Sequence, residues 1–93
     1  MKKYLKGTRQ VITENNRIIN LEYYLVESTY YEKDKAKIAY GIEILKRDNC
    51  NHLESDIVSK VTDSKDKIIN IINKLIANIV TPVGIVCAID ELF

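Results

Sequence analysis

The sequence is poor in the residues from which most catalytic and metal sites are built. It has one histidine, His52, and two cysteines, Cys50 and Cys87, which are far apart in the chain. This pattern fits neither a zinc site, a catalytic triad nor a disulfide framework. We therefore expect no metal, no cofactor and no enzymatic activity, with both cysteines as reduced thiols. The segment Cys50-Asn51-His52 is interpreted as a polar turn, and the alternative is a thiol activated by the imidazole.

Glycine, proline and long apolar runs are also scarce. The three glycines, Gly7, Gly41 and Gly84, form no phosphate-binding loop motif. The longest apolar stretches, residues 75–80 and 83–89, are too short to cross a bilayer. The basic start is not followed by the apolar run of a signal peptide. We therefore expect a cytoplasmic protein without a membrane partner.

Charge of either sign is not in excess, since 14 Lys and Arg residues stand against 13 Asp and Glu residues. Such a balance gives no general attraction to nucleic acid or to an anionic membrane. The one local excess is at the N-terminus, which carries Lys2, Lys3, Lys6 and Arg9 before the first acidic residue. Because chain termini are commonly solvated, we interpret residues 1–7 as a basic end of the kind that frays.

The chain does contain enough apolar residues for one domain. Its 93 residues are 46% hydrophobic, which suffices for a single core without a metal or a disulfide. From Thr8 to Arg47 the apolar pattern has a period of two, and it becomes helical about two thirds of the way along. The sequence therefore predicts one α+β domain over residues 1–93. Its fold would be a three- or four-stranded antiparallel meander followed by two C-terminal helices packed on one face.

The predicted strands cover residues 8–13, 17–29 and 36–47. Residues 53–61 fit both a strand and a helix period, and we favour a fourth strand. In the first hairpin, a two-residue Asn-Asn turn would place Arg9 opposite Glu22. It would also leave Ile12 as the large apolar residue that an edge strand contributes to the core.

Register in the other two hairpins follows from side-chain alternation, because paired residues on neighbouring strands share a face. A loop at residues 32–35 would pair Tyr23 with Ile44 in the second hairpin. A four-residue loop after the third strand would pair Ile42 with Ile57. Both pairs join apolar residues on the core face.

Two helices are predicted after the strands. Capping residues precede residues 65–79, whose apolar side chains form a stripe that Ile69 and Ile71 widen beyond the usual width. This helix is therefore expected either to be covered on more than one side or to expose a patch for a partner. Thr81 and Pro82 then resemble the N-cap and first position of a second, terminal helix.

Three segments of the chain resemble a known group of sequences. They are Tyr40-Gly41-Ile42-Glu43-Ile44, Val80-Thr81-Pro82-Val83 and Ile89-Asp90-Glu91-Leu92-Phe93. Their order resembles a family of small uncharacterised bacterial proteins of the Clostridia type, from anaerobic Gram-positive genomes. Its members share a YGIEI-like strand and a VTP-initiated acidic C-terminal helix. The resemblance implies a fold and a cytoplasmic location, and it transfers no catalytic residue.

The predicted interaction surface is the sheet face opposite the predicted core, together with the wide apolar stripe of the helix at residues 65–79. Tyr and aliphatic side chains on an exposed sheet suggest contact with another protein. We therefore expect a non-enzymatic interaction or regulatory module that binds a protein partner or itself, with a homodimer favoured. The candidate interaction residues are Ile18, Glu22, Tyr24, Val26, Leu45, Ile69 and Ile71.

The alternative is a small nucleic-acid-binding module. Tyr24 would stack on bases, and the basic N-terminus with Arg9, Lys37 or Arg47 would contact phosphates. Glu22 and Glu43 lie on the same predicted face and oppose this reading through their negative charge.

Overall fold

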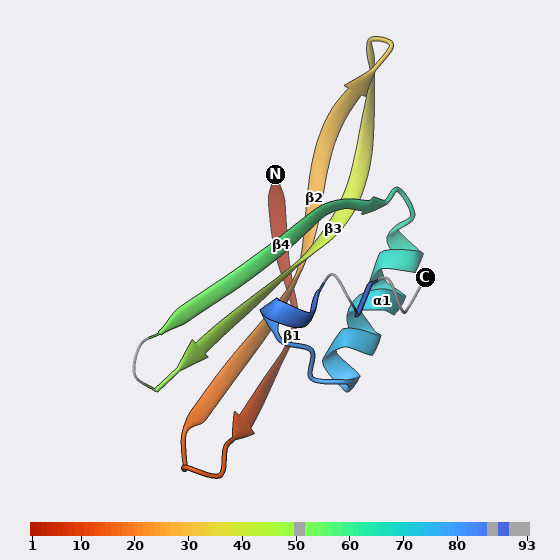
Figure 1. The fold of residues 1–93 in the computed structure, drawn as a ribbon. Coiled ribbons are helices and arrows are strands. Elements are labelled where there is room, and N and C mark those ends of the chain that lie inside the picture. Colours follow the sequence, from red (N-terminus) through yellow and green to blue (C-terminus); the bar gives the residue numbers. More distant parts are fainter. Residues whose placement is uncertain (50–51, 86–87, 90–93) are drawn as a thin grey trace.

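The computed structural model describes residues 1–49, 52–85 and 88–89. Within these residues the chain forms one four-stranded antiparallel sheet, one α-helix and one 3-10 helix (Figure 1). The elements are β1 (Lys2–Ile12), β2 (Ile18–Glu32), β3 (Lys35–Asp48), β4 (Leu53–Thr62), α1 (Lys65–Ala77) and η1 (Pro82–Gly84). The strands follow one another in the order β1-β2-β3-β4, so the predicted meander is confirmed and residues 53–62 are its fourth strand.

The central hairpin has the register that the sequence predicts. Tyr23 pairs with Ile44, and the ladder continues to Glu32 opposite Lys35. Lys33 and Asp34 form the turn, with φ angles of 51° and 64°. Two successive positive φ values are typical of the two-residue hairpin turn whose twist matches that of the strands.

The predicted registers of both outer hairpins are wrong by one residue. Arg9 pairs with Leu21 instead of Glu22, and Ile42 pairs with Val58 instead of Ile57. In the first hairpin only Asn16 has a positive φ, 58°, and the amide of Thr13 donates a hydrogen bond to the carbonyl of Arg17. The loop is therefore one residue longer than an Asn-Asn turn.

This shift moves side chains of β1 to the other face of the sheet. Val11 packs against the core, whereas Ile12 is 67% exposed. The basic N-terminus, interpreted above as an end that frays, forms the first half of β1 and pairs as far as Lys2 opposite Glu27. A bulge at Lys6 interrupts this ladder.

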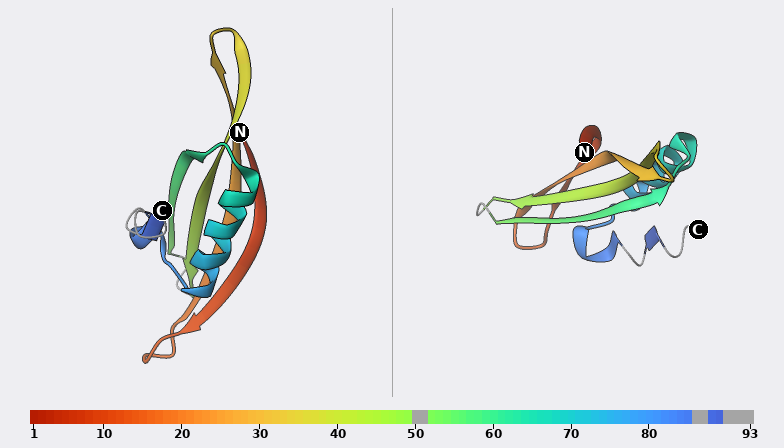
Figure 2. Two further views of the ribbon diagram at one scale, coloured as in Figure 1. Left: turned by 90° about the vertical axis from the view of Figure 1, so that its right-hand side faces the viewer. Right: turned by 90° about the horizontal axis from the view of Figure 1, so that it is seen from above.

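One face of the sheet, called the inner face below, carries the core. It consists of Leu21, Tyr23 and Leu25 of β2 with Ile42 and Ile44 of β3. Helix α1 lies across this face (Figure 2) and buries its apolar stripe against it. The helical residues involved are Ile68, Ile71, Ile72 and Leu75. Ser64 caps the helix by accepting a hydrogen bond from the amide of Lys67.

The predicted second C-terminal helix is wrong. Among the described residues the segment after α1 is a 3-10 helix over Pro82–Gly84, in which the Gly84 amide donates to the Thr81 carbonyl at 3.0 Å. Thr81 makes no side-chain capping bond. Glycine beside the β-branched Val83 and Ile85 has low helix propensity, which favours the tighter turn. The predicted acidic end, Asp90 and Glu91, lies outside the described residues.

The segment after α1 is held to the sheet by Tyr23. Its buried hydroxyl donates a hydrogen bond of 2.9 Å to the carbonyl of Val80. Beyond this point Pro82, Ile85 and Ile89 are buried. The bond thus fixes the place at which the chain turns back from the helix onto the inner face.

We expect Tyr23→Phe to lower the free energy of unfolding by about 1–2 kcal/mol, because the Val80 carbonyl loses its donor. Denaturant unfolding monitored by circular dichroism measures this change. Tyr31→Phe is the matched control, since Tyr31 is 76% exposed and should tolerate the change. Equal stability of Tyr23→Phe and the wild type would contradict this role of the hydroxyl.

The same substitution should change the response to alkali. Burial raises the pKa of Tyr23, so that its hydroxyl stays protonated in the folded state above the pH at which it ionises in the unfolded chain. The Tyr23 contribution to stability is therefore complete below about pH 10 and falls as the pH rises further. The free energy of unfolding of the Tyr23→Phe variant should therefore fall less above about pH 10 than that of the wild type.

Candidate interaction surfaces

The face of the sheet opposite the core, called the outer face below, is not covered by α1 or η1. Cross-strand pairing assembles it in rows, because paired residues share a face. The central row runs Leu5, Tyr24, Glu43 and Ile57, and the neighbouring row runs Thr8, Glu22, Leu45 and Ser55. Each row therefore takes one side chain from each of the four strands.

The outer face exposes apolar side chains in adjacent positions. Leu5 is 55% exposed and Ile57 is 39% exposed, at the two ends of the central row. Ile18 is also exposed, whereas Tyr24 and Leu45 are half-buried. Since these residues come from all four strands, the apolar surface spans the width of the sheet.

Two carboxylates lie in the middle of this surface. The Tyr24 hydroxyl donates a hydrogen bond to Glu22, and the Lys3 ammonium lies 3.1 Å from a carboxylate oxygen of Glu43. The bond to Glu22 raises the pKa of Tyr24, because the neutral hydroxyl is the donor, and desolvation adds to this shift. Glu43 is thus neutralised in part by Lys3, and Glu22 accepts the hydrogen bond from Tyr24.

The seven predicted interaction residues do not all reach this surface. Ile18, Glu22, Tyr24 and Leu45 share the outer face as expected. Val26 lies there too but is fully buried, opposite Gly41. Ile71 is buried in the core, and Ile69 packs partly against it, so the wide helix stripe reflects core packing.

Leu5 and Ile57 were missed by sequence reasoning. Leu5 was assigned to a fraying end, and Ile57 was assigned to the core by the one-residue error in the last hairpin. Ile57 would have been placed on the correct face by a loop one residue shorter than the predicted four-residue loop. The Asp48 amide donates a hydrogen bond to the His52 carbonyl, so these two residues close the loop.

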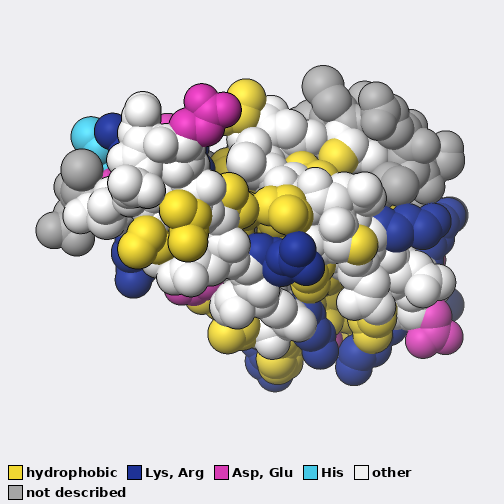
Figure 3. All heavy atoms as spheres, turned by 90° about the horizontal axis from the view of Figure 1, so that it is seen from below, with side chains coloured by type: hydrophobic (Ala, Val, Ile, Leu, Met, Phe, Trp, Pro, Cys, Tyr) yellow, Lys and Arg dark blue, Asp and Glu magenta, His cyan; other side chains and the backbone are white. Residues whose placement is uncertain are grey.

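The residues of the nucleic-acid alternative are divided between two faces. Tyr24 and Arg47 are on the outer face, whereas Arg9 pairs with Leu21 and lies on the inner-face side of β1. Figure 3 shows the lower end of the molecule, where Lys and Arg side chains are interspersed with hydrophobic ones. The placement therefore does not join Tyr24 and Arg9 in one basic, aromatic surface.

The only histidine is at the surface. The His52 side chain is 85% exposed, and its Nδ1 lies 3.8 Å from a carboxylate oxygen of Asp48. Cys50, its expected neighbour, lies outside the described residues. In the part of the chain that the structure describes, no three His, Cys, Asp or Glu residues are grouped as metal ligands would be.

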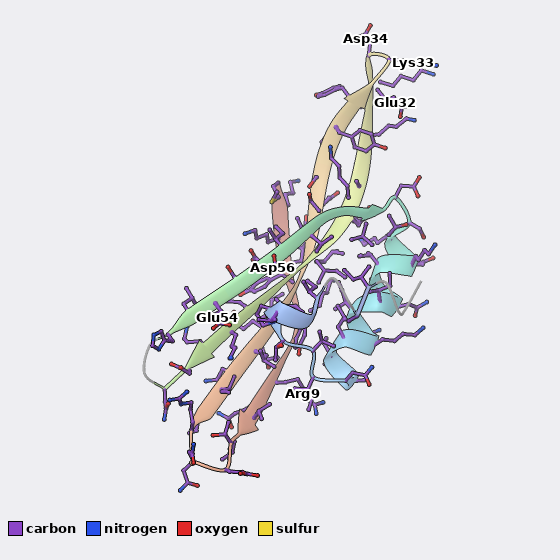
Figure 4. All side chains as sticks on the ribbon, viewed as in Figure 1. Arg9, Glu32, Lys33, Asp34, Glu54 and Asp56 are labelled. Atoms are coloured by element: carbon purple, nitrogen blue, oxygen red, sulfur yellow. The ribbon has the colours of Figure 1, made fainter. Side chains whose placement is uncertain are left out.

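A second exposed feature is an arm formed by residues 28–39. β1 accompanies β2 only to Glu27, and β4 accompanies β3 only from Tyr40, so the central hairpin continues alone beyond the sheet. Figure 1 shows this arm projecting from the body, and the molecule measures 53 × 25 × 18 Å. Lys33 and Asp34 are at its tip (Figure 4).

Comparison with known proteins gives a family without a function. A family model described as "Family of unknown function (DUF6514)" matches residues 2–93. No curated protein and no solved structure matches the chain. No helix among the described residues is long and apolar enough to cross a membrane.

Proposed function

We propose that this chain, which belongs to the DUF6514 family of unknown function, is a non-enzymatic module that binds another protein through its outer face. The observation that carries the proposal is the central row of the outer face, in which the exposed side chains of Leu5 and Ile57 flank the half-buried Tyr24 and Glu43. Aromatic side chains are enriched at protein interfaces relative to the rest of a protein surface, and exposed aliphatic side chains beside them add apolar area that a partner can bury.

The charges of the outer face favour a particular kind of partner. Glu22 and Glu43 flank Tyr24 near the middle of the surface. A second copy stacked face to face about a central two-fold axis would bring these acids near their own counterparts, which is unfavourable. A partner that presents apolar side chains together with Lys or Arg would complement the surface instead. We therefore infer that the outer face binds a different, basic and apolar protein segment.

The test compares two variants as bait in affinity capture from cells of the source organism. The first carries Leu5→Lys and Ile57→Lys, which place charges at both ends of the central row. The control carries Val83→Lys, because Val83 is an exposed aliphatic residue of η1 away from the outer face. Each protein captured by the wild type is then purified and its affinity measured by calorimetry.

We expect the outer-face variant to lose at least tenfold in affinity for the purified partner, because charges replace apolar anchors. The Val83→Lys control should bind as the wild type does. Equal affinities of all three proteins would overturn the proposal. Salt-sensitive binding of mixed oligonucleotides, reduced by Arg47→Ala, would instead favour the nucleic-acid alternative.

A further inference from the structure

In the part of the chain that the structure describes, neither edge of the arm pairs with another strand, and the two edges differ in charge. The β2 edge carries Ser28, Thr29, Tyr30 and Tyr31 before its first charged residue, Glu32. The β3 edge carries Lys35 and Lys37 within five residues of the turn. Lysine on an edge strand opposes pairing with another chain, so the β3 edge is protected in a way that the β2 edge is not.

The turn determines which backbone groups point outward. In a two-residue hairpin the pair flanking the turn, here Glu32 and Lys35, is hydrogen-bonded, and such pairs alternate with pairs that are not. The residues in the pairs Tyr31–Ala36 and Thr29–Ile38 are therefore not hydrogen-bonded to each other. Their N–H and C=O groups point away from the hairpin, and on the β2 edge β1 pairs only as far as Glu27.

We propose that the arm pairs edge to edge with the arm of a second copy of this chain, through residues 28–32 of β2. Because only Thr29 and Tyr31 direct backbone groups outward, the antiparallel two-fold pairing that uses both residues of each copy sets Thr29 of one copy opposite Tyr31 of the other. Tyr30 then lies opposite its own counterpart on the axis. The two arms form one four-stranded sheet, held by four hydrogen bonds between the copies.

Charge on the strands themselves favours the β2 edge for this contact, although the Lys60 ammonium lies 5.3 Å from the centroid of the Tyr30 ring. In the two-fold β2 pairing, Glu32 lies opposite Ser28, and the central pair is aromatic, which stabilises neighbouring strands. The same pairing through the β3 edge would set Ala36 opposite Ile38 and Lys37 opposite its own counterpart. Like charges directly opposite are destabilising, and the ion pair of Lys37 with Glu32 at 2.9 Å reduces this repulsion only in part because both side chains are about half exposed. A second copy is thus compatible with the β2 edge and is opposed at the β3 edge.

The free edge also has the length that this pairing requires. It is bounded by the row of Lys2 and Glu27 at one end and by the turn at Lys33 at the other. The five residues between them are centred on Tyr30, so two copies occupy each other's free edge symmetrically. This contact is separate from the outer face and does not depend on the proposed function.

The test is the oligomeric state of the full chain, measured by sedimentation velocity across a range of concentrations. We expect a wild-type dimer and a dissociation constant about 30-fold higher for Thr29→Pro, which removes two of the four inter-chain hydrogen bonds. Ile38→Pro is the matched control, because Ile38 is the cross-strand partner of Thr29 and directs its amide to the other edge. A strict monomer, or equal effects of the two prolines, would overturn the proposal.

A second measurement covers the case in which proline unfolds the arm. In a background of Cys50→Ser and Cys87→Ser, Tyr30→Cys should form a disulfide between copies under mild oxidation, because the two positions face each other across the axis. Lys37→Cys, on the neighbouring strand of the same arm, should remain reduced. Crosslinking of Lys37→Cys as fast as Tyr30→Cys would also contradict pairing through the β2 edge.

Discussion

Gly41→Ala is expected to lower the free energy of unfolding by about 3 kcal/mol, as a severe case of overpacking. A Cβ atom at this position would lie 2.2 Å from the carbonyl oxygen of Val58 and 2.7 Å from the Cα of Ser59. Both are backbone atoms of β4, so no side-chain rotation relieves the contact. The ladder between β3 and β4 would have to open at the bulge beside Gly41.

The other two glycines provide graded controls for this measurement by chemical denaturation. At Gly7 the atom nearest to the added Cβ would be the flexible end of Ile76, at 2.6 Å, so Gly7→Ala should cost less and Ile76→Val should restore part of the loss. At Gly84 the nearest atom is 3.7 Å away, and Gly84→Ala should be tolerated. A stability of Gly41→Ala within about 0.5 kcal/mol of the wild type would contradict the close strand approach.

Leu75→Ala is expected to cost about 3 kcal/mol, because Leu75 is fully buried between α1 and the inner face. Ile57→Ala is its counterpart on the outer face and should cost less than about 1 kcal/mol. Thermal and denaturant unfolding would measure both.

This comparison also tests the register of the last hairpin. If Ile57 were on the core face, as the sequence predicted, its truncation would cost about as much as that of Leu75. Val58→Ala should instead exceed Ile57→Ala, although valine is the smaller residue, because Val58 packs against the core and pairs with Ile42.

The sequence predicted the central hairpin and failed at its neighbours for a definite physical reason. Strand alternation and an even-numbered loop at residues 32–35 agree on one register, so the pairing of Tyr23 with Ile44 could be derived, although the loop itself is the two-residue turn of Lys33 and Asp34. The registers of the two outer hairpins depend on whether the loop between the strands has an odd or an even number of residues. Asn16 alone adopts a positive φ, and sequence patterns do not distinguish this from a two-residue Asn turn.

The candidate surface was predicted only in part for the same reason. Tyr24 and Leu45 were placed correctly because they belong to the central hairpin, whereas Ile57 was placed on the wrong face by one residue of loop. The wide stripe of α1 left open whether the helix is covered on more than one side or exposes a patch for a partner, and Ile71 packs into the core. The sequence does not distinguish these two cases, because the width of an apolar stripe does not show what covers it.

The central claim is that the sheet buries one face and leaves the other accessible to a partner. Solvent paramagnetic relaxation enhancement of methyl groups, measured on the free protein by NMR, tests this claim most directly. We expect strong enhancement for the methyl groups of Leu5 and Ile57 and little for those of Ile42 and Ile44, which are fully buried. Equal protection of Leu5, Ile57 and Ile42 would contradict an accessible outer face.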